Sequence, residues 1–482
     1  MEIHSLSVKS ILQGLKKKDF TCQELTKEYL DNIRKQDREI NAFINVEEKQ
    51  VLSQAKKIDQ SLSGEEGSLS LTGLPIAVKD NILVKGQKCT AGSKILENYI
   101  APYSATVIKE ITQAGGLVLG KTNLDEFACG SSGEHSAFGI TRNPNNLEYV
   151  PGGSSSGSAA AVAANMTPVA LGSDTAGSIR LPASFCGIAG FKPTYGAISR
   201  YGLIALASSL DQIGVLAKSA EDIEIIFGIL KHRDKMDSTS TEIPTGKKVD
   251  SLKGLVIGLP KECFAQGIGK QVLEITNKAV KKLESEGAKI KEIDMPNLEY
   301  GVACYYIVMA AELSSNLARY DGIRYGSSEE KSKDLIDLYF KTRGRFFGKE
   351  IKRRIMLGTY ALSAGYYDAY YLKAAKVRTL IKQEYEKVLN QVDCLVAPVA
   401  PTPAFKIGEK IDDPLQMYLA DVLTVPINTA GVPAISIPCG FTDNLPVGMQ
   451  IIGKHFDEAK ILQVANNYEQ ATEWHKKKPN ID

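Results

Sequence analysis

The spacing of hydrophobic residues changes repeatedly between helical and strand-like periods along the chain. Near the amino terminus, Leu25, Tyr29 and Ile33 recur at helical spacing, and the stretch from Thr21 to Glu24 before them has the form of a capping box. Helices are therefore expected between residues 5 and 60. In the rest of the first half, the pattern predicts a strand at 74–78, a helix at 104–114, a strand at 117–119 and a capped helix at 219–230.

The second half repeats this alternation after a polar, turn-rich segment at 231–254. There the pattern predicts a strand at 254–259, a helix at 270–287, a helical region rich in charge and tyrosine at 303–375, a strand at 394–398 and a final amphipathic helix at 458–474. Alternating strands and helices indicate an α/β fold. On composition alone, the polar segment is a candidate linker that would divide the chain near residue 240.

One uncharged stretch lies between these elements. The 24 residues 150–173 carry no charge and contain five serines, and a second small-residue loop, DTAGS, then ends at Ser178. The stretch is expected to be buried, and buried hydroxyls need hydrogen-bond partners. One interpretation is a serine nucleophile at Ser178 with a helper serine in the first loop. The other is a pair of tight turns around a buried helix.

A lysine directly follows the predicted strand 74–78. Lys79 at the rim of a sheet would be an ordinary solvated charge. A buried Lys79 would instead have a lowered pKa and could act as a base, because burial disfavours the ammonium form. Both interpretations are compatible with this position alone.

Two other features point less clearly to function. Residues 115–122 match the G-x-x-x-x-G-K-[ST] pattern of phosphate-binding loops, but the middle of the match is the predicted strand, so ATP binding there is disfavoured. His135 is the histidine near the candidate serines. It is interpreted as a surface or hydrogen-bonded residue, because nothing else supports a Ser-His-Asp triad.

Composition narrows the possible functions. The net charge is +2, without the strongly basic balance of a dedicated nucleic-acid-binding protein. The eight cysteines form no CxxC motif, so free thiols in a reducing cytosol are expected and no metal site is suggested. Neither a signal peptide nor a membrane-spanning run is evident, and a cytoplasmic location is expected.

The ordered set of Lys79 after a strand, then GGSSSGSAA, then DTAGSIR resembles the amidase signature family. The resemblance is most specific through residues 73–215 and continues along nearly the whole chain. It implies one α/β domain over 1–482, with a central mixed β-sheet covered by helices on both faces. In that arrangement 73–215 is the signature core, 231–254 is a polar insertion or loop, and 5–60 forms N-terminal helices.

The resemblance also implies a Ser-Ser-Lys triad and the role of each member. Ser178 matches the nucleophile that forms the acyl-enzyme, Ser154 the bridging serine that follows a cis peptide, and Lys79 the base. Backbone N–H groups are implied to form the oxyanion hole, and they belong to Thr175, Ala176, Gly177 and Ser178. Ala176 and Ser156 stand where many family members carry glycine.

Further stretches, among them TNLDEFACGSS and DVLTVPINTAGVPAISIP, resemble the glutaminase members of this family that work in tRNA-dependent amidotransferases. That resemblance implies hydrolysis of glutamine through a seryl acyl-enzyme, with the ammonia converting Glu-tRNA(Gln) to Gln-tRNA(Gln). It implies a heterotrimer with subunits B and C, no cofactor in this chain, and ATP and Mg²⁺ on a partner subunit.

Four residues are candidates for glutamine binding by the same resemblance: Ser131, Tyr305, Arg354 and Asp421. Arg354 suits the α-carboxylate, because its planar guanidinium can bind both oxygens, and Asp421 suits the α-ammonium. The basic run at 349–354 is otherwise typical of a solvated helix face.

Two other classes of function remain as alternatives. A free-standing amidase of the same family would act on a small amide without partner subunits. A non-catalytic scaffold with this fold would be expected to lose part of the triad, whereas Lys79, Ser154 and Ser178 are all present.

Overall fold

The computed structural model describes residues 3–61, 70–244, 246, 250–265 and 267–479. Among these residues, eleven strands form one mixed sheet in the order β1-β3-β2-β4-β6-β5-β10-β11-β9-β7-β8. The strands are β1 Phe43–Asn45, β2 Pro75–Lys79, β3 Leu117–Thr122, β4 Val169–Asp174, β5 Ala189–Lys192, β6 Gln212–Ala217, β7 Val256–Pro260, β8 Lys289–Ile293, β9 Cys394–Pro398, β10 Ala434–Thr442 and β11 Leu445–Ile452.

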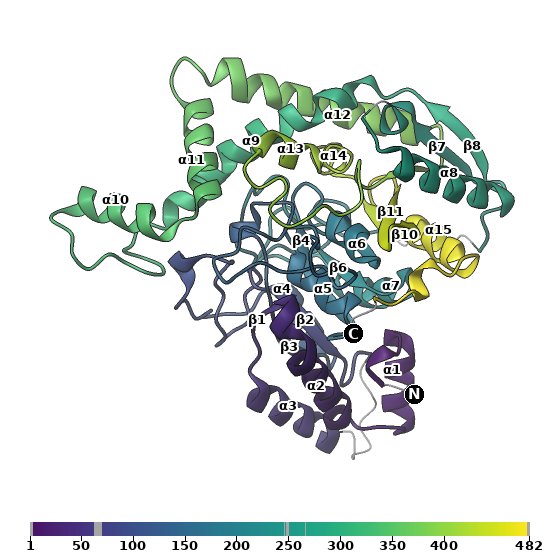
Figure 1. Ribbon diagram of the computed structural model, residues 1–482, viewed down its shortest axis with the longest axis horizontal. Coiled ribbons are helices and arrows are strands. Elements are labelled where there is room, and N and C mark those ends of the chain that lie inside the picture. Colours follow the sequence, from purple (N-terminus) through teal and green to yellow (C-terminus); the bar gives the residue numbers. More distant parts are fainter. Residues whose placement is uncertain (1–2, 62–69, 245, 247–249, 266, 480–482) are drawn as a thin grey trace.

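Helices surround this sheet (Figure 1). They are α1 Val8–Lys17, α2 Cys22–Ile40, α3 Glu48–Ser61, α4 Thr106–Gln113, α5 Ser156–Ala163, α6 Arg180–Cys186, α7 Ala220–Leu230, α8 Lys270–Ser285, α9 Gly301–Asn316, α10 Leu335–Phe346, α11 Lys349–Leu362, α12 Lys373–Leu389, α13 Pro414–Leu419, α14 Val425–Ala430 and α15 Glu458–Gln470. In Figure 1, α2 and α3 lie at one end of the molecule, and α9, α11 and α12 lie at the other.

Both faces of the sheet are packed. Strand β9 shows this directly, because successive side chains of a strand point to opposite faces. Cys394 and Val396 belong to a hydrophobic cluster that includes residues of α8 and α15. Leu395 and Ala397 belong to a second cluster, which includes residues of α9 and α12. The expected α/β fold, a mixed sheet with helices on both faces, is confirmed.

Strand β2 pairs in parallel with both β3 and β4. The carboxyl ends of these three strands therefore lie at one edge of the sheet, which is where open α/β sheets usually place their ligands. Lys79 is the last residue of β2, and Asp174 is the last residue of β4. The loops that follow these two strands are thus brought together by the pairing.

The helix caps predicted from the sequence are present in the structure. Thr21 and Glu24 form the capping box at the start of α2, and Ser219 caps α7. The segment 231–254 contains no helix or strand among its described residues, and 245 and 247–249 lie outside them. Strands from both sides of this segment share the sheet, since β5 pairs with β10.

All eight cysteines are free and buried, which confirms the expectation of free thiols. Across the described ranges, no helix combines the length and the apolar character needed to cross a membrane.

Candidate active site

The amine of Lys79 is surrounded by serine hydroxyls. Its Nζ lies 2.8 Å from Ser154 Oγ and 2.9 Å from both Ser155 Oγ and Ser173 Oγ. The Ser173 hydroxyl is also held by the Asn81 amide at 3.0 Å. Lys79 and Ser154 are both fully buried. The structure therefore contradicts a solvated lysine at the sheet rim and favours a buried amine.

Burial lowers the pKa of Lys79 to about 7. The main cause is desolvation, which penalises the ammonium form. Three carboxylates, those of Asp125, Asp174 and Asp211, oppose this shift, but they do not cancel it. A substantial fraction of Lys79 is therefore neutral near pH 7 and able to accept a proton.

Ser154 lies in the Gly/Ser-rich loop just before α5. The peptide bond between Gly153 and Ser154 is cis, as the family resemblance implied. The next residue, Ser155, donates its backbone N–H to the carbonyl of Ser178 at 3.1 Å. This hydrogen bond joins the first serine loop to the second one, so that both loops meet beside Lys79.

A buried ion pair between Asp174 and Arg180 stabilises the second loop, which carries Ser178. Asp174 accepts hydrogen bonds from the backbone N–H of Ile179 at 3.1 Å and from Arg180 Nε at 3.2 Å. Both side chains are fully buried, and Arg180 holds the pKa of Asp174 below its usual value despite desolvation. The Thr175 hydroxyl donates to Asp211 at 2.6 Å, which fixes the other end of the loop.

Ser178 is the least buried member of the implied triad. Its relative exposure is 6%, whereas Lys79 and Ser154 have none. A nucleophile must meet substrate, whereas a bridging serine and a base need not, so this gradient agrees with the implied roles.

The loop from Thr175 to Ser178 has room for alanine at its second position. Ala176 has no positive φ, so glycine is not required there. Gly177 is different, because a methyl group at that position would overlap the side chain of Thr424. Thr424 in turn donates its hydroxyl to the carbonyl of Asp421 at 3.1 Å, which connects this loop to the candidate glutamine-binding residues.

Arg354 projects inward from α11. Its guanidinium lies against the rings of Tyr306 and Tyr418, 5.0 and 4.9 Å from their centroids, and these two rings stack on each other with their centroids 4.0 Å apart. Its Nε donates to Glu350 Oε1 at 2.7 Å. Arg354 is buried, whereas Lys352 and Arg353 in the same basic run are exposed. The expected solvated helix face thus holds for those two neighbours and is wrong for Arg354.

Asp421 lies within electrostatic range of Arg354 and accepts a hydrogen bond from the Ser131 hydroxyl. Its burial raises its pKa to about 7, and both Ser131 and Arg354 counteract this rise. Tyr305 is buried within the electrostatic range of both charged groups, and desolvation raises its pKa. The four candidate binding residues are therefore brought together, next to the triad.

Sequence reasoning missed several contacts within this site. Ser155 and Ser173 approach Lys79 as closely as Ser154 does, to within 0.1 Å. Glu350, Tyr306 and Tyr418 surround Arg354 and were not anticipated. A signal for Glu350 was present, because an acidic residue four positions before an arginine faces it on a helix.

The weaker sequence features fall outside the site. The match to a phosphate-binding loop runs into strand β3, where Lys121 is buried and pairs with Asp80 at 3.1 Å. This is the strand expected from the pattern, and it presents no phosphate-binding loop. His135 is half-buried, and its backbone N–H donates to Asp125 at 3.0 Å.

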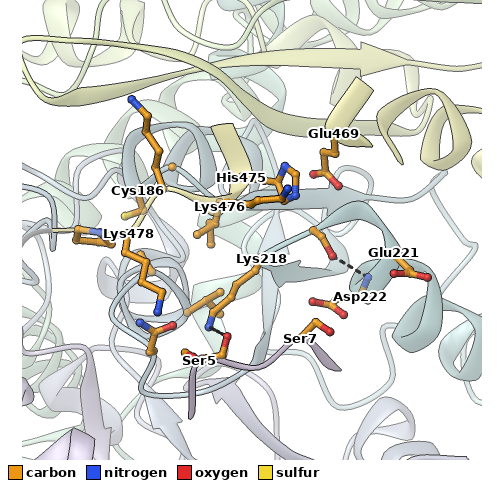
Figure 2. Close-up of a pocket in the computed structure, with 18 of the residues that line it drawn as sticks. Ser5, Ser7, Cys186, Lys218, Glu221, Asp222, Glu469, His475, Lys476 and Lys478 are labelled. Atoms are coloured by element: carbon orange, nitrogen blue, oxygen red, sulfur yellow. Dashed lines mark hydrogen bonds between the residues drawn. The ribbon is translucent and has the colours of Figure 1, made fainter. Parts of the chain in front are cut away.

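Among the described residues, no group of three or more His, Cys, Asp or Glu side chains could hold a metal ion. A cavity of about 590 Å³ is lined by residues that include Lys218, Glu469 and Lys478 (Figure 2). No triad residue and no candidate binding residue lines it.

Known proteins resemble this chain over its whole length. The amidase family matches residues 24–462. The glutamyl-tRNA(Gln) amidotransferase A subunit of Thermoanaerobacter pseudethanolicus is 53% identical, over 99% of this chain and 98% of that protein. The crystal structure of the same subunit from Thermotoga maritima is 42% identical, with a TM-score of 0.81 over 98% of this chain and 95% of that one. A peptide amidase from Stenotrophomonas maltophilia is 29% identical, with a TM-score of 0.82 over 99% and 98%.

Proposed function

The chain belongs to the amidase family, and on that premise we propose that it is the glutaminase subunit of a tRNA-dependent amidotransferase. The contact that carries the proposal is the 2.8 Å approach of Lys79 Nζ to Ser154 Oγ, in a site that also holds Arg354 and Asp421. The triad supplies amide hydrolysis, and the two opposite charges suit a free amino acid with an amide side chain. Full-length similarity to the corresponding amidotransferase subunits of two bacteria supports the same assignment.

The first chemical step makes the acyl-enzyme. Ser178 Oγ attacks the side-chain amide carbon of glutamine, while its proton passes to Ser154 and the Ser154 proton passes to neutral Lys79. Negative charge develops on the amide oxygen. Backbone N–H groups of residues 175–178 stabilise that oxyanion.

The second step releases ammonia, and the third restores the serine. The carbon–nitrogen bond breaks as the proton on Lys79 returns through Ser154 to the leaving nitrogen. Water then attacks the ester, and its proton passes through Ser154 to Lys79. That proton returns through Ser154 to Ser178 Oγ as the acyl group leaves, so the products are glutamate and free Ser178. The proton count closes over the cycle, and no oxidant or metal is needed.

Substrate recognition follows from charge. Arg354 binds the α-carboxylate of glutamine through its two Nη groups, since its Nε is already engaged by Glu350. Asp421 and Ser131 bind the α-ammonium. The clamp lies next to the nucleophile loop, because Thr424 packs beside Gly177 and donates its hydroxyl to the Asp421 carbonyl. Glutamine held by the clamp therefore has its amide directed toward Ser178.

Partner subunits complete the proposed reaction. Subunits B and C form a heterotrimer with this chain, and ATP with Mg²⁺ on a partner activates the glutamate carried by mischarged Glu-tRNA(Gln). Ammonia that glutamine releases at Ser178 then converts that glutamate to glutamine. With ATP and Mg²⁺ on the partner, the chain itself needs no cofactor. Its net charge of +2 fits a subunit that does not bind tRNA by itself.

The test is ammonia release from glutamine by the purified chain, alone and with subunits B and C, charged tRNA and ATP. We expect strong stimulation by the partners. Full activity of the chain alone, with simple amides hydrolysed as readily as glutamine, would instead identify a free-standing amidase.

A further inference from the structure

Glu126 is a buried carboxylate that lies outside the catalytic machinery described above. It has a relative exposure of 3% and sits in the turn that follows β3. Its Oε2 accepts the backbone N–H of Gly348 at 2.9 Å, and its Oε1 accepts the Ser93 hydroxyl. Glu126 therefore connects two segments separated by more than 200 residues in the sequence.

Gly348 is the N-cap residue of α11, and no side chain of its own caps the helix. The Glu126 carboxylate supplies an acceptor at this end, where a negative charge is also favoured by the helix dipole. The fit is close, because a methyl group on Gly348 would overlap Glu126 Oε2. The adjacent residues add a second contact, with the Phe127 and Phe347 rings 5.8 Å apart.

Helix α11 carries Arg354, so the position of its first turn sets the position of the guanidinium. The residue before Glu126, Asp125, fixes the loop that contacts Asp421, the second charged residue of the proposed glutamine site. Asp125 accepts the backbone N–H groups of Gly133 and His135, at 3.0–3.1 Å, and so fixes the loop that presents Ser131 to Asp421. One short stretch of chain thus holds both charged ends of the proposed glutamine site.

We propose that Glu126 is a positioning residue for glutamine recognition, which holds α11 so that Arg354 stands at the correct distance from Asp421. The proposal rests on the proposed function. It assigns Glu126 no part in proton transfer, because its contacts reach α11 and Ser93 rather than the triad. Loss of Glu126 should therefore weaken substrate binding and leave the chemical step intact.

The experiment measures KM and kcat for glutamine in the assembled heterotrimer with tRNA and ATP. We expect Glu126→Ala to raise KM about tenfold, as for loss of a helix-capping hydrogen bond, with kcat unchanged within about twofold. Glu126→Gln should restore the KM, since its amide oxygen can accept from Gly348 while its NH₂ group donates to Ser93 Oγ. Glu97→Ala, which removes a carboxylate paired with Lys94 at the surface, is the matched control.

A double-mutant cycle tests the specific contact. Gly348→Ala alone should raise KM, because its methyl group displaces the carboxylate. In the Glu126→Ala background the same change should add less than about twofold, since nothing remains to be displaced. Fully additive effects, or a fall in kcat at unchanged KM, would overturn the proposal. Absence of glutaminase activity in the wild-type complex would instead refute the proposed function.

Discussion

Lys79 Nζ lies 2.8 Å from Ser154 Oγ at a point in the fold where neither side chain has any exposure to solvent. A lysine in water would hold its proton far too tightly to act as a base at neutral pH. In this surrounding its pKa is lowered to about 7, so that it can take a proton and return it within one turnover.

Removal of the nucleophile should stop the reaction at the first step. We expect Ser178→Ala to abolish ammonia release from glutamine, because no acyl-enzyme can form. The variant should still bind glutamine and melt at a temperature close to that of the wild type, as its hydroxyl is not part of the bracing around Asp174. Normal turnover would refute the assignment of Ser178.

Replacement of the base should act on kcat. Lys79→Met keeps the length of the side chain but removes the amine, and we expect kcat to fall by about 10²–10⁴-fold, the usual contribution of general acid–base catalysis. Lys192 provides a matched control, since it is also fully buried with a pKa lowered to about 7, but its Nζ bonds Pro193 O. Lys192→Met should retain kcat per folded molecule, and equal losses in both variants would contradict a specific role.

The pH dependence of kcat/KM for glutamine should depend on two groups, both of which lose their function when they gain a proton. Lys79 must be neutral and Asp421 must be ionised, and both have a pKa of about 7. Lowering the pH through 7 protonates both groups and removes both functions. We therefore expect log(kcat/KM) for glutamine to fall below pH 7 with a limiting slope of about two.

A variant can separate these two titrations. Asp421→Asn removes one titrating group, so its residual activity should fall with a slope of about one. A wild-type profile that stays flat down to pH 5 would contradict the proposed states of both residues.

The guanidinium clamp should be sensitive even to a conservative change. We expect Arg354→Ala to raise KM for glutamine by about 10–100-fold, the effect of losing a charge-assisted hydrogen bond. We expect Arg354→Lys to raise KM nearly as much, because an ammonium has no planar fork to bind both carboxylate oxygens and no planar face to lie against the rings of Tyr306 and Tyr418. Steady-state kinetics over a range of glutamine concentrations would show this, and an unchanged KM in both variants would exclude Arg354 from the clamp.

The ion pair beneath the nucleophile loop should contribute strongly to stability. Arg180→Met leaves the Asp174 carboxylate buried without its cation, and we expect the free energy of unfolding to fall by about 3–5 kcal/mol. Urea denaturation would measure the loss. A decrease below about 1 kcal/mol would mean that Asn428 and the backbone N–H of Ile179 satisfy Asp174 on their own.

The parts of the fold and site that sequence predicted are those with a local or ordered signature. Spacing and composition alone predicted the capping box at Thr21, the strand before Lys79 and the burial of the uncharged stretch that contains α5 and most of β4. Ser178 and Lys79 were candidates from the residues alone, but the bridging serine could be chosen only through the family resemblance, because Ser154, Ser155 and Ser156 are adjacent in the sequence and their roles depend on tertiary position.

The remaining features depend on contacts between distant segments. The pairing of β5 with β10 joins segments more than 240 residues apart, and no local pattern encodes it. Similarly, Arg354 lies in a basic run that has the composition of a solvated surface. Its burial arises only when α11 packs against the rings of Tyr306 and Tyr418, which belong to α9 and α13.

The bracing of the nucleophile loop has a consequence for biosynthesis. Arg180 bonds Gln450 at 3.0 Å and the carbonyl of Thr424 at 3.2 Å, and Asn428 bonds Asp174 at 2.9 Å. A ribosome delivers Ser178 long before it delivers these partners. The nascent chain therefore carries its nucleophile in a loop that lacks the contacts from residues 424–450, and the complete site for breaking down glutamine forms only as translation nears its end.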